Sequence, residues 1–225
     1  MRSNDGSPSP DRALTCPVCE TGSVRFFARP DARRYYRCRN CGATFLDPVQ
    51  RPTPEAERRE YDLHRNDPDD PGYRRFLSRL AAPLLTRLIP DARGLDYGCG
   101  PGPALAVMLR EAGFEVETWD PVYDARTEAL ERRYAFITCT EVVEHMHHPA
   151  EEFRRLDRLL EPGGWLGITT QFQSDDARFA NWHYRRDPTH VVFYREATLR
   201  HVARRFGWAF DAPGAGVALM KKPAA

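Results

Sequence analysis

The chain is poor in lysine and has no excess of either charge. Its only lysines are Lys221 and Lys222, so arginine supplies nearly all of the positive charge, which we attribute to coding bias. The 33 basic and 32 acidic residues almost cancel. This balance argues against a surface devoted to a polyanion, although it leaves room for a local basic patch.

Long apolar runs are missing as well. No segment approaches the roughly 20 apolar residues that a membrane helix needs, and residues 1–10 lack the apolar stretch of a signal peptide. We therefore expect a cytoplasmic protein without a membrane partner, with a disordered tail over residues 1–12. Six cysteines in such a protein favour metal binding or reactive thiols over disulfides.

Four of these cysteines form two CxxC pairs, one on each side of the segment 20–37. They are Cys16, Cys19, Cys38 and Cys41. Two such knuckles supply the four thiolates of a tetrahedral zinc site, and Gly22 and Gly42 follow them where a positive φ would help. With short strands expected over 24–27 and 35–37, the pattern predicts a zinc ribbon over residues 13–48. The alternatives are a redox pair or a chance array, and the ribbon itself could be structural or could recognise a substrate or partner.

Residues 49–92 are expected to form a linker and N-terminal helices. The segment 47–71 is rich in Pro, Asp and Arg, with a short helix over 55–61. Apolar residues at helical spacing over 73–89 predict a helix that lies on the following domain and bends at Pro83.

The remaining residues, 93–225, alternate between strand and helix patterns. Strands are expected over 94–97, 114–119, 134–140, 165–170, 208–210 and 217–220, and helices over 103–112, 150–160 and 196–206. This alternation predicts an α/β, Rossmann-like domain with a mostly parallel sheet that is flanked by helices.

A glycine-rich turn follows the first of these strands. Asp96 is followed by Gly98, Gly100 and Gly102, and Asp120 ends the next strand along the chain. Glycines at such a turn let the backbone approach a nucleotide-type cofactor, and a carboxylate at the second strand can accept hydrogen bonds from ribose. The leading acid suits the cationic S-adenosylmethionine and would repel a pyrophosphate, which disfavours a dehydrogenase.

With these pieces the chain resembles the class I S-adenosylmethionine-dependent methyltransferases over residues 73–220. The matching segments are 95–102, 119–120, 134–145 and 160–166. The resemblance implies cofactor contacts from Asp96, Tyr97, Gly98, Cys99, Gly100, Gly102, Asp120 and Thr140. Some bacterial methyltransferases that modify sugars or rRNA guanine also carry a zinc ribbon ahead of this domain. One departure is that only the short segment 121–133 separates Asp120 from Tyr134, so the third strand is abbreviated or lost.

A second constellation joins Glu141, Glu144 and His145, which would share one face of a helical turn. It resembles the Glu-x-x-Glu-His site of small-RNA 2′-O-methyltransferases, in which a later histidine completes a metal site; His190 is the first candidate here and His183 a weaker one. Such groups could hold a divalent ion such as Mg²⁺ and activate a hydroxyl. Alternatively, a histidine acts as a general base, or the residues merely cap the cofactor pocket.

For the other candidate residues, a role in packing or simple surface exposure is also considered. The aromatic residues Trp182, Tyr184 and Phe193 form either an acceptor wall or a packed lid. His147 and His148 are expected in an exposed loop, and Cys99 and Cys139 are expected as small buried fillers.

These observations predict a methyltransferase that acts on a small metabolite or glycosyl compound, by in-line transfer to oxygen or carbon. One alternative is an RNA methyltransferase whose arginine-rich ribbon grips nucleic acid, with Phe26, Tyr35 and Tyr36 stacking on bases. The other is a non-catalytic binding protein that retains the fold.

Overall fold

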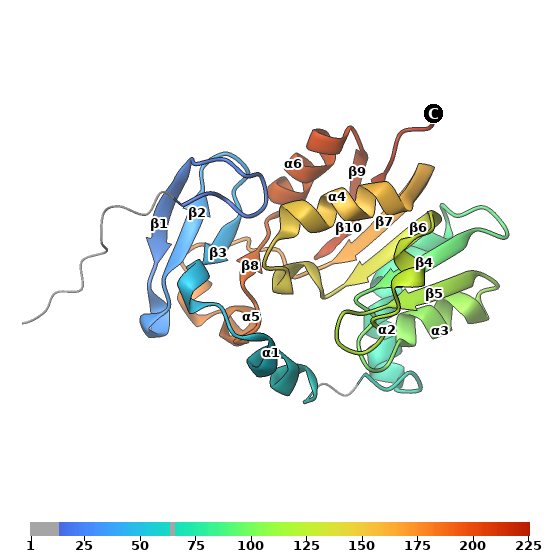
Figure 1. Cartoon of the computed structure of the whole chain (residues 1–225), viewed down its shortest axis with the longest axis horizontal. Coiled ribbons are helices and arrows are strands. Elements are labelled where there is room, and N and C mark those ends of the chain that lie inside the picture. The colour runs from blue at the N-terminus through green and yellow to red at the C-terminus, as the bar shows by residue number, and fades with distance from the viewer. Residues whose placement is uncertain (1–13, 64–65) are drawn as a thin grey trace, which may run out of the picture.

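The computed structural model describes residues 14–63 and 66–225, so the tail predicted over residues 1–12 lies outside the described residues. Figure 1 shows a small sheet next to a larger one that is flanked by helices on both faces. The small sheet contains β1 (Val24–Ala28), β2 (Tyr35–Cys38), β3 (Thr44–Leu46) and β8 (Val192–Phe193). Its strands pair antiparallel in the order β1-β2-β3-β8.

The larger sheet has six strands in the order β5-β4-β6-β7-β10-β9. They are β4 (Arg93–Tyr97), β5 (Glu115–Trp119), β6 (Tyr134–Thr140), β7 (Leu160–Thr169), β9 (Ala209–Gly214) and β10 (Val217–Lys221). β5, β4, β6 and β7 run parallel, whereas β10 is antiparallel to both β7 and β9. The predicted α/β fold with a mostly parallel sheet is therefore confirmed.

Helices cover both faces of the larger sheet. α2 (Pro71–Leu85) and α3 (Ala104–Glu111) lie on one face, and α4 (Pro149–Leu159) and α6 (Glu196–Phe206) lie on the other. α1 (Pro54–Tyr61) and α5 (His183–Arg186) are short helices outside these two layers (Figure 1). Side chains alternate along a strand, so Val217 and Leu219 of β10 pack in the core under α2 and α3, while Ala218 and Met220 pack in the core under α4 and α6. Short 3-10 turns are η1 (Pro30–Ala32), η2 (Pro48–Gln50), η3 (Thr127–Leu130), η4 (Val143–His145) and η5 (Phe179–Asn181).

The third strand of the family pattern is absent from the described residues. β5 is an edge strand, and the chain passes from it through η3 directly into β6. A shallow pocket of about 430 Å³ remains beside this edge, lined by residues that include Val116, Thr118 and Ala129. The short spacing after Asp120 thus predicted the lost strand correctly.

The small sheet is joined to the rest of the protein by β8, which comes from a segment much further along the chain than β1, β2 and β3. Tyr35, Phe45 and Leu46 are buried in the same core as Phe153 of α4 and Leu199 of α6. The domain boundaries given above remain predictions, but the ribbon and the larger sheet share a continuous core.

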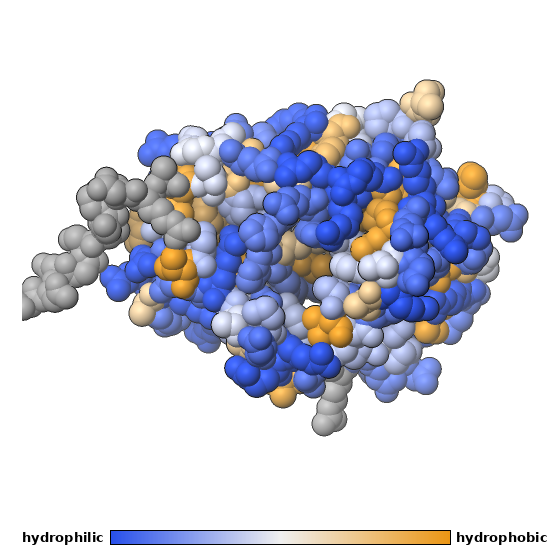
Figure 2. Space-filling view, viewed as in Figure 1, coloured by the Kyte–Doolittle hydropathy of each residue, from blue (hydrophilic) through white to orange (hydrophobic). Residues whose placement is uncertain are grey.

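The outer surface is mostly hydrophilic on the face seen in Figure 2, where apolar residues are scattered among charged ones. In the described part of the chain, no helix is both long enough and apolar enough to cross a membrane.

Candidate active site

The four cysteines of the two CxxC pairs meet at one point. Their sulfur atoms all lie within 4.8 Å of one another, with 3.6 Å between Cys16 and Cys41 and 3.5 Å between Cys19 and Cys38. A tetrahedral zinc site with Zn–S bonds of about 2.3 Å places its sulfurs about 3.8 Å apart. The hydrogen bond between Cys16 and Cys41 lowers the pKa of the Cys16 thiol to about 6 and raises that of the Cys41 thiol, so the fit to a metal rests on the positions of the four sulfurs. The cluster therefore fits Zn²⁺.

The two knuckles have equivalent backbones. Glu20 and Gly42 each lie four residues after the first cysteine of their pair, and both have a positive φ, 60° and 78°. Each also donates its N–H to that cysteine's carbonyl oxygen. The expectation that Gly22 supplies the positive φ is wrong, because Glu20 occupies the position equivalent to Gly42.

The glycine turn leaves the end of β4, as predicted. Gly98 has a φ of 78°, and a Cβ there would lie 2.6 Å from the Val142 side chain. A Cβ on Gly102 would lie 1.9 Å from the carbonyl oxygen of Asn66, so the segment before α2 rests directly on the turn. Both positions require glycine because no side chain could be accommodated.

Acidic side chains surround this turn. Asp96 is buried and accepts a 2.7 Å hydrogen bond from Thr138, yet burial raises its pKa to about 6. Burial, and then the charges of Asp96, Asp120 and Asp124, raise the pKa of the Cys99 thiol. Such a negative environment favours a cationic ligand over a phosphate, which fits S-adenosylmethionine.

Asp120 links the glycine turn after β4 to the loop after β5. One carboxylate oxygen accepts the Gly100 N–H at 2.9 Å, and the other accepts the N–H groups of Val122 and Tyr123 at 2.8 and 3.0 Å. The predicted ribose contact would therefore involve a carboxylate whose position is already fixed by backbone donors.

The predicted catalytic residues lie at the ends of β6 and β7, but they do not share a helical face. Glu141 has a left-handed backbone with a φ of 52° and precedes η4, so the expectation of one helical turn through Glu141, Glu144 and His145 is wrong. Instead, the Tyr184 hydroxyl donates to Glu144 Oε1 at 2.5 Å and also lies 3.2 Å from Glu141 Oε2. Thr140 lies beside them, and its hydroxyl has no hydrogen-bond partner among the described residues.

Glu144, His145 and His190 form the second candidate metal group. One ligand atom from each lies within 4.8 Å of the others, and Glu141 does not belong to this group. Glu144 is fully buried, and its Oε2 has no hydrogen-bond partner in the part of the chain that the structure describes. Burial, and then the Glu141 charge, raise the Glu144 pKa well above its usual value. A divalent ion fits here because it would satisfy that orphaned oxygen.

Hydrogen bonds orient both imidazoles. His145 Nδ1 lies 3.2 Å from the Thr189 carbonyl, and His190 Nδ1 lies 2.6 Å from the Tyr184 carbonyl. A carbonyl can only accept, so Nδ1 carries the proton and Nε2 the lone pair when these histidines are neutral. His190 Nε2 also lies 3.8 Å from Asp187 Oδ2, close enough for an ion pair when His190 is protonated. His183 contacts Gln171 at 3.3 Å and is not part of the cluster.

Helix α1 contributes residues that the sequence did not reveal. The Tyr61 ring packs edge-on against His145 with centroids 5.3 Å apart, and burial, then Glu57, Asp187, Asp120 and Glu144, raise its pKa. The contact of Tyr61 with His145 was not predicted, because the sequence indicates only a short helix within a Pro-rich connector here. The only signal for this contact in the sequence is an aromatic residue at the end of a short predicted helix.

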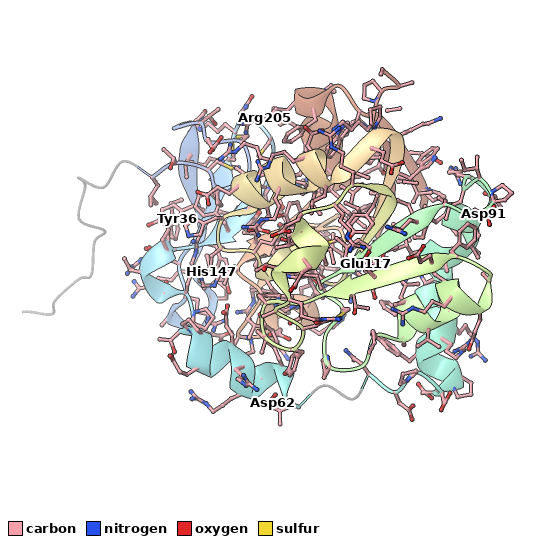
Figure 3. All side chains as sticks on the ribbon, turned by 45° about the vertical axis from the view of Figure 1, so that its right-hand side comes forward. Tyr36, Asp62, Asp91, Glu117, His147 and Arg205 are labelled. Carbon is pink, nitrogen blue, oxygen red and sulfur yellow. The ribbon has the colours of Figure 1, made fainter. Side chains whose placement is uncertain are left out.

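The loop after η4 is also tied to α1. His147 Nε2 lies 2.8 Å from Glu57 Oε1, and Arg51 donates to the His147 carbonyl at 2.9 Å. His147 is half-buried near the ribbon and α1 (Figure 3), so the expectation that it is exposed is wrong, whereas that for His148 is confirmed.

The aromatic segment after β7 faces both the site and the ribbon. Phe193 is fully buried between Tyr35 and Phe179, with centroid distances of 5.9 and 5.4 Å, and therefore packs rather than lining an acceptor pocket. Tyr184 reaches the catalytic carboxylates, as described above. Because Tyr35 is fully buried, the expectation that it stacks on nucleic-acid bases is wrong.

Comparisons with known proteins agree with this geometry. Residues 70–212 match a family model described as a methyltransferase domain. A ubiquinone biosynthesis O-methyltransferase from Serratia proteamaculans is 31% identical over 91 residues, which are 40% of this chain and 38% of that relative's length. The alignment thus spans well under half of the curated relative.

Two solved structures match parts of this chain, and the likeness of fold rests on the first of them. The PH0226 protein from Pyrococcus horikoshii is 15% identical, covers 73% of this chain and 98% of its own, and gives a TM-score of 0.50. A SAM-dependent methyltransferase from Methanosarcina mazei is 13% identical, with coverages of 63% and 97% and a TM-score of 0.46.

Proposed function

Because this chain belongs to the methyltransferase-domain family and is a class I S-adenosylmethionine-dependent methyltransferase, we propose that it methylates a hydroxyl oxygen of a small molecule. The observation that carries the proposal is the buried Oε2 of Glu144, which has no hydrogen-bond partner among the described residues and lies beside the imidazoles of His145 and His190. Methyl transfer to oxygen needs a group that removes the hydroxyl proton, whereas a neutral amine or thiolate needs less help. The curated relative named above acts on oxygen, which supports the same chemistry.

The cofactor side has separate roles. Asp96 would attract the ammonium group, the Gly98–Gly102 backbone would let the cofactor approach, and Asp120 would accept from ribose. S-adenosylmethionine supplies an electrophilic methyl group on a cationic sulfur.

The acceptor side would deprotonate and align the hydroxyl. His145 or His190 would accept the hydroxyl proton at Nε2, and the neighbouring Glu144 carboxylate would stabilise the imidazolium that forms. The methyl group would come from S-adenosylmethionine. If Glu144, His145 and His190 hold a divalent ion, that ion would lower the pKa of the hydroxyl instead. Tyr184 holds the Glu144 carboxylate through a hydrogen bond. Excluding water and aligning the reactants would supply most of the remaining acceleration.

The test is product analysis with the full chain, labelled S-adenosylmethionine, and a panel of phenols, alcohols and sugars together with the amines of matching shape. We expect methylated hydroxyl products and at least a 100-fold loss of rate in Glu144→Gln, the usual size for such groups. Glu131→Gln, at an exposed position, serves as the matched control. Methylation of the amines in preference to the hydroxyls, or full activity of Glu144→Gln, would refute the proposed chemistry.

A further inference from the structure

The ribbon and the catalytic cluster are connected by backbone hydrogen bonds. The Leu46 N–H of β3 donates to the Val191 carbonyl at 2.9 Å, and the Val191 N–H donates to the Glu144 carbonyl at 2.9 Å. Val191 follows His190 in the chain. One short piece of backbone therefore carries His190, holds Glu144 and is itself held by the ribbon.

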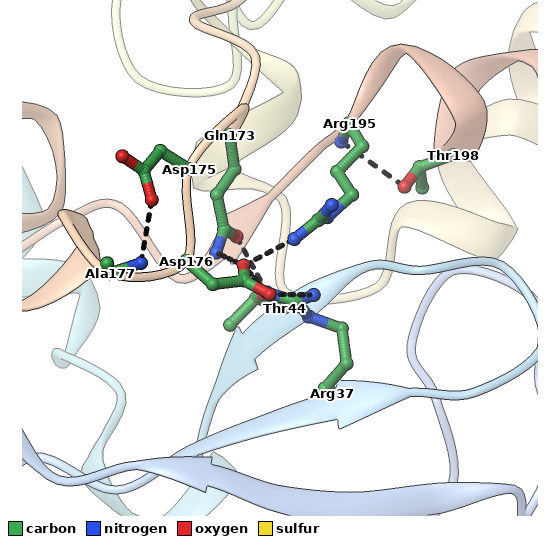
Figure 4. Close-up of polar contacts among 8 residues, drawn as sticks. All are labelled: Arg37, Thr44, Gln173, Asp175, Asp176, Ala177, Arg195 and Thr198. Carbon is green, nitrogen blue, oxygen red and sulfur yellow. Dashed lines mark hydrogen bonds and ion pairs between the residues drawn. The ribbon is translucent and has the colours of Figure 1, made fainter.

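A polar network joins the ribbon to Gln173 and Asp176, as Figure 4 shows. The Gln173 N–H donates to the Tyr194 carbonyl at 2.8 Å, which links this network to the segment after His190. Arg37 of β2 donates to the Thr44 hydroxyl at 2.6 Å, and that hydroxyl donates to Gln173 at 2.7 Å. Arg37 also pairs with Asp176 at 2.8 Å, and Arg195 pairs with the same carboxylate. Because Arg37, Thr44 and Gln173 are buried, removal of one partner would leave the others unsatisfied.

Aromatic packing forms a third connection. Phe193 of β8 contacts Tyr35 of the ribbon on one side and His190 on the other, with centroid distances of 5.9 and 6.4 Å. His190 in turn packs against Tyr184 at 4.1 Å. Displacement of the ribbon would therefore remove a packing partner from the cluster.

The cysteine site adjoins β2 and β3, the two strands whose residues make all three connections. Cys38 is the last residue of β2, and Cys41 lies just before β3. A ribbon this small buries little core of its own, so bound zinc would supply much of its folding free energy. Order in β2 and β3 would then depend on the metal.

We propose that the ribbon is a positioning element for the catalytic cluster: zinc at the four cysteines fixes β2 and β3, and Arg37, Thr44 and Leu46 transmit that order to Glu144 and His190. The inference rests on the proposed function for the roles of Glu144 and His190. Among the described residues, the cofactor turn at the ends of β4 and β5 has no hydrogen bond to Arg37, Thr44 or Leu46, and it meets the affected segment at Val142, whose side chain lies beside Gly98. Loss of zinc therefore disorders the acceptor side of the site while cofactor binding persists.

The test compares amide hydrogen exchange of the full chain before and after zinc extraction by a chelator. Peptides covering residues 142–147 and 189–194 should exchange at least about tenfold faster without zinc, and those covering 93–98 and 115–119 should change less than about twofold. S-adenosylhomocysteine should keep its affinity within about threefold by calorimetry. Unchanged exchange over 142–147 and 189–194, with the ribbon deprotected, would overturn the proposal.

Matched variants test the path with zinc retained. Arg37→Gln should accelerate exchange over 189–194 and shift the ring ¹⁵N resonances of His190, while Arg25→Gln should do neither. Arg25 is exposed and lies opposite Arg37 in the β1–β2 register. Arg37→Lys, which keeps a charge beside Asp176, should restore part of the protection.

Thr44→Val is the second variant in case Arg37→Gln loses zinc. It removes the hydroxyl that links Arg37 to Gln173 with little change of volume. The proposed path from Arg37 and Thr44 to His190 is refuted if both zinc-loaded variants exchange over residues 189–194 at the wild-type rate and show wild-type His190 ring resonances. A failure of the proposed function would appear separately in the product analysis, as methylation of amines in preference to hydroxyls by the zinc-loaded protein.

Discussion

Asp96→Asn should stabilise the cofactor-free protein at neutral pH while weakening cofactor binding. The Asp96 pKa is raised from 3.8 to about 6 by burial. A carboxyl whose pKa is higher in the folded state favours its protonated form there. Stability is therefore greatest below pH 3.8 and falls as the pH rises through about 6. The shift of about 2 units costs about 3 kcal/mol of stability at pH 7.5.

The asparagine side chain has no such cost and can still accept the Thr138 hydrogen bond. Its amide N–H₂ needs a partner, so the gain at pH 7.5 is at most about 3 kcal/mol. The pH dependence is the sharper quantity. Between pH 7.5 and pH 5 the wild type should gain about 1.4 kcal/mol relative to Asp96→Asn.

Urea unfolding at these two pH values measures the difference directly. Asp91→Asn is the control, because Asp91 is exposed at the far end of the molecule from the ribbon (Figure 3). In the same variants, calorimetry at pH 7.5 should show S-adenosylmethionine binding about 10- to 100-fold more weakly to Asp96→Asn, the range for a lost charge-assisted hydrogen bond. A stability difference that is independent of pH, or unchanged cofactor affinity, would refute the reasoning.

Three further outcomes concern the acceptor site, the turn and the metal. Glu144→Gln should keep its affinity for S-adenosylhomocysteine within about threefold despite its loss of turnover; weaker binding by calorimetry would place Glu144 in the cofactor site. Gly102→Ala should lose about 1–3 kcal/mol in thermal unfolding, because its Cβ would lie 1.9 Å from Asn66, whereas Gly22→Ala, with open space around it, should not. Metal analysis should find zinc in the wild type and in Cys139→Ser, and chelation should lower Tm by several degrees; an unchanged Tm would show that the cysteines need no metal.

The sequence predicted the larger sheet well because its elements are defined by local patterns. The helix expected over 196–206 has those bounds, since Gly207 takes a φ of 70° and ends it. The strand expected over 134–140 is likewise observed as β6, because a continuous apolar run is buried on both faces. The absence of the third strand was predicted from the short length of the segment 121–133 alone.

The join between the two sheets could not be predicted in this way. β8 has two residues, and its pairing of Thr44 with Phe193 spans a long stretch of chain. A segment this short has no periodicity, and its strand geometry depends on the partner that it meets. The role of Tyr61 was hidden for a related reason, since a helix in a Pro-rich connector has no sequence feature that fixes where it packs.

The catalytic cluster was predicted in composition but not in geometry. His190 does join Glu144 and His145. The helical spacing suggested that Glu141 would join them too, but its left-handed backbone directs it to Tyr184 instead. The spacing of residues in the sequence predicts which side chains share a helix face only where the backbone is regular.

The structure also determines how the role of the ribbon can be tested. Deletion of residues 1–48 would remove β3, so Val191 would lose its hydrogen bond to Leu46 and Phe193 would lose the cover of Tyr35. A loss of activity would then have two possible causes, disorder at the catalytic cluster and loss of a bound ligand, which the deletion does not separate. Substitution of Phe26 avoids this ambiguity, because it is 51% exposed on β1, the strand furthest from β8 in the small sheet. A nucleic-acid role therefore requires that Phe26→Ser weaken RNA binding while exchange over residues 189–194 stays unchanged.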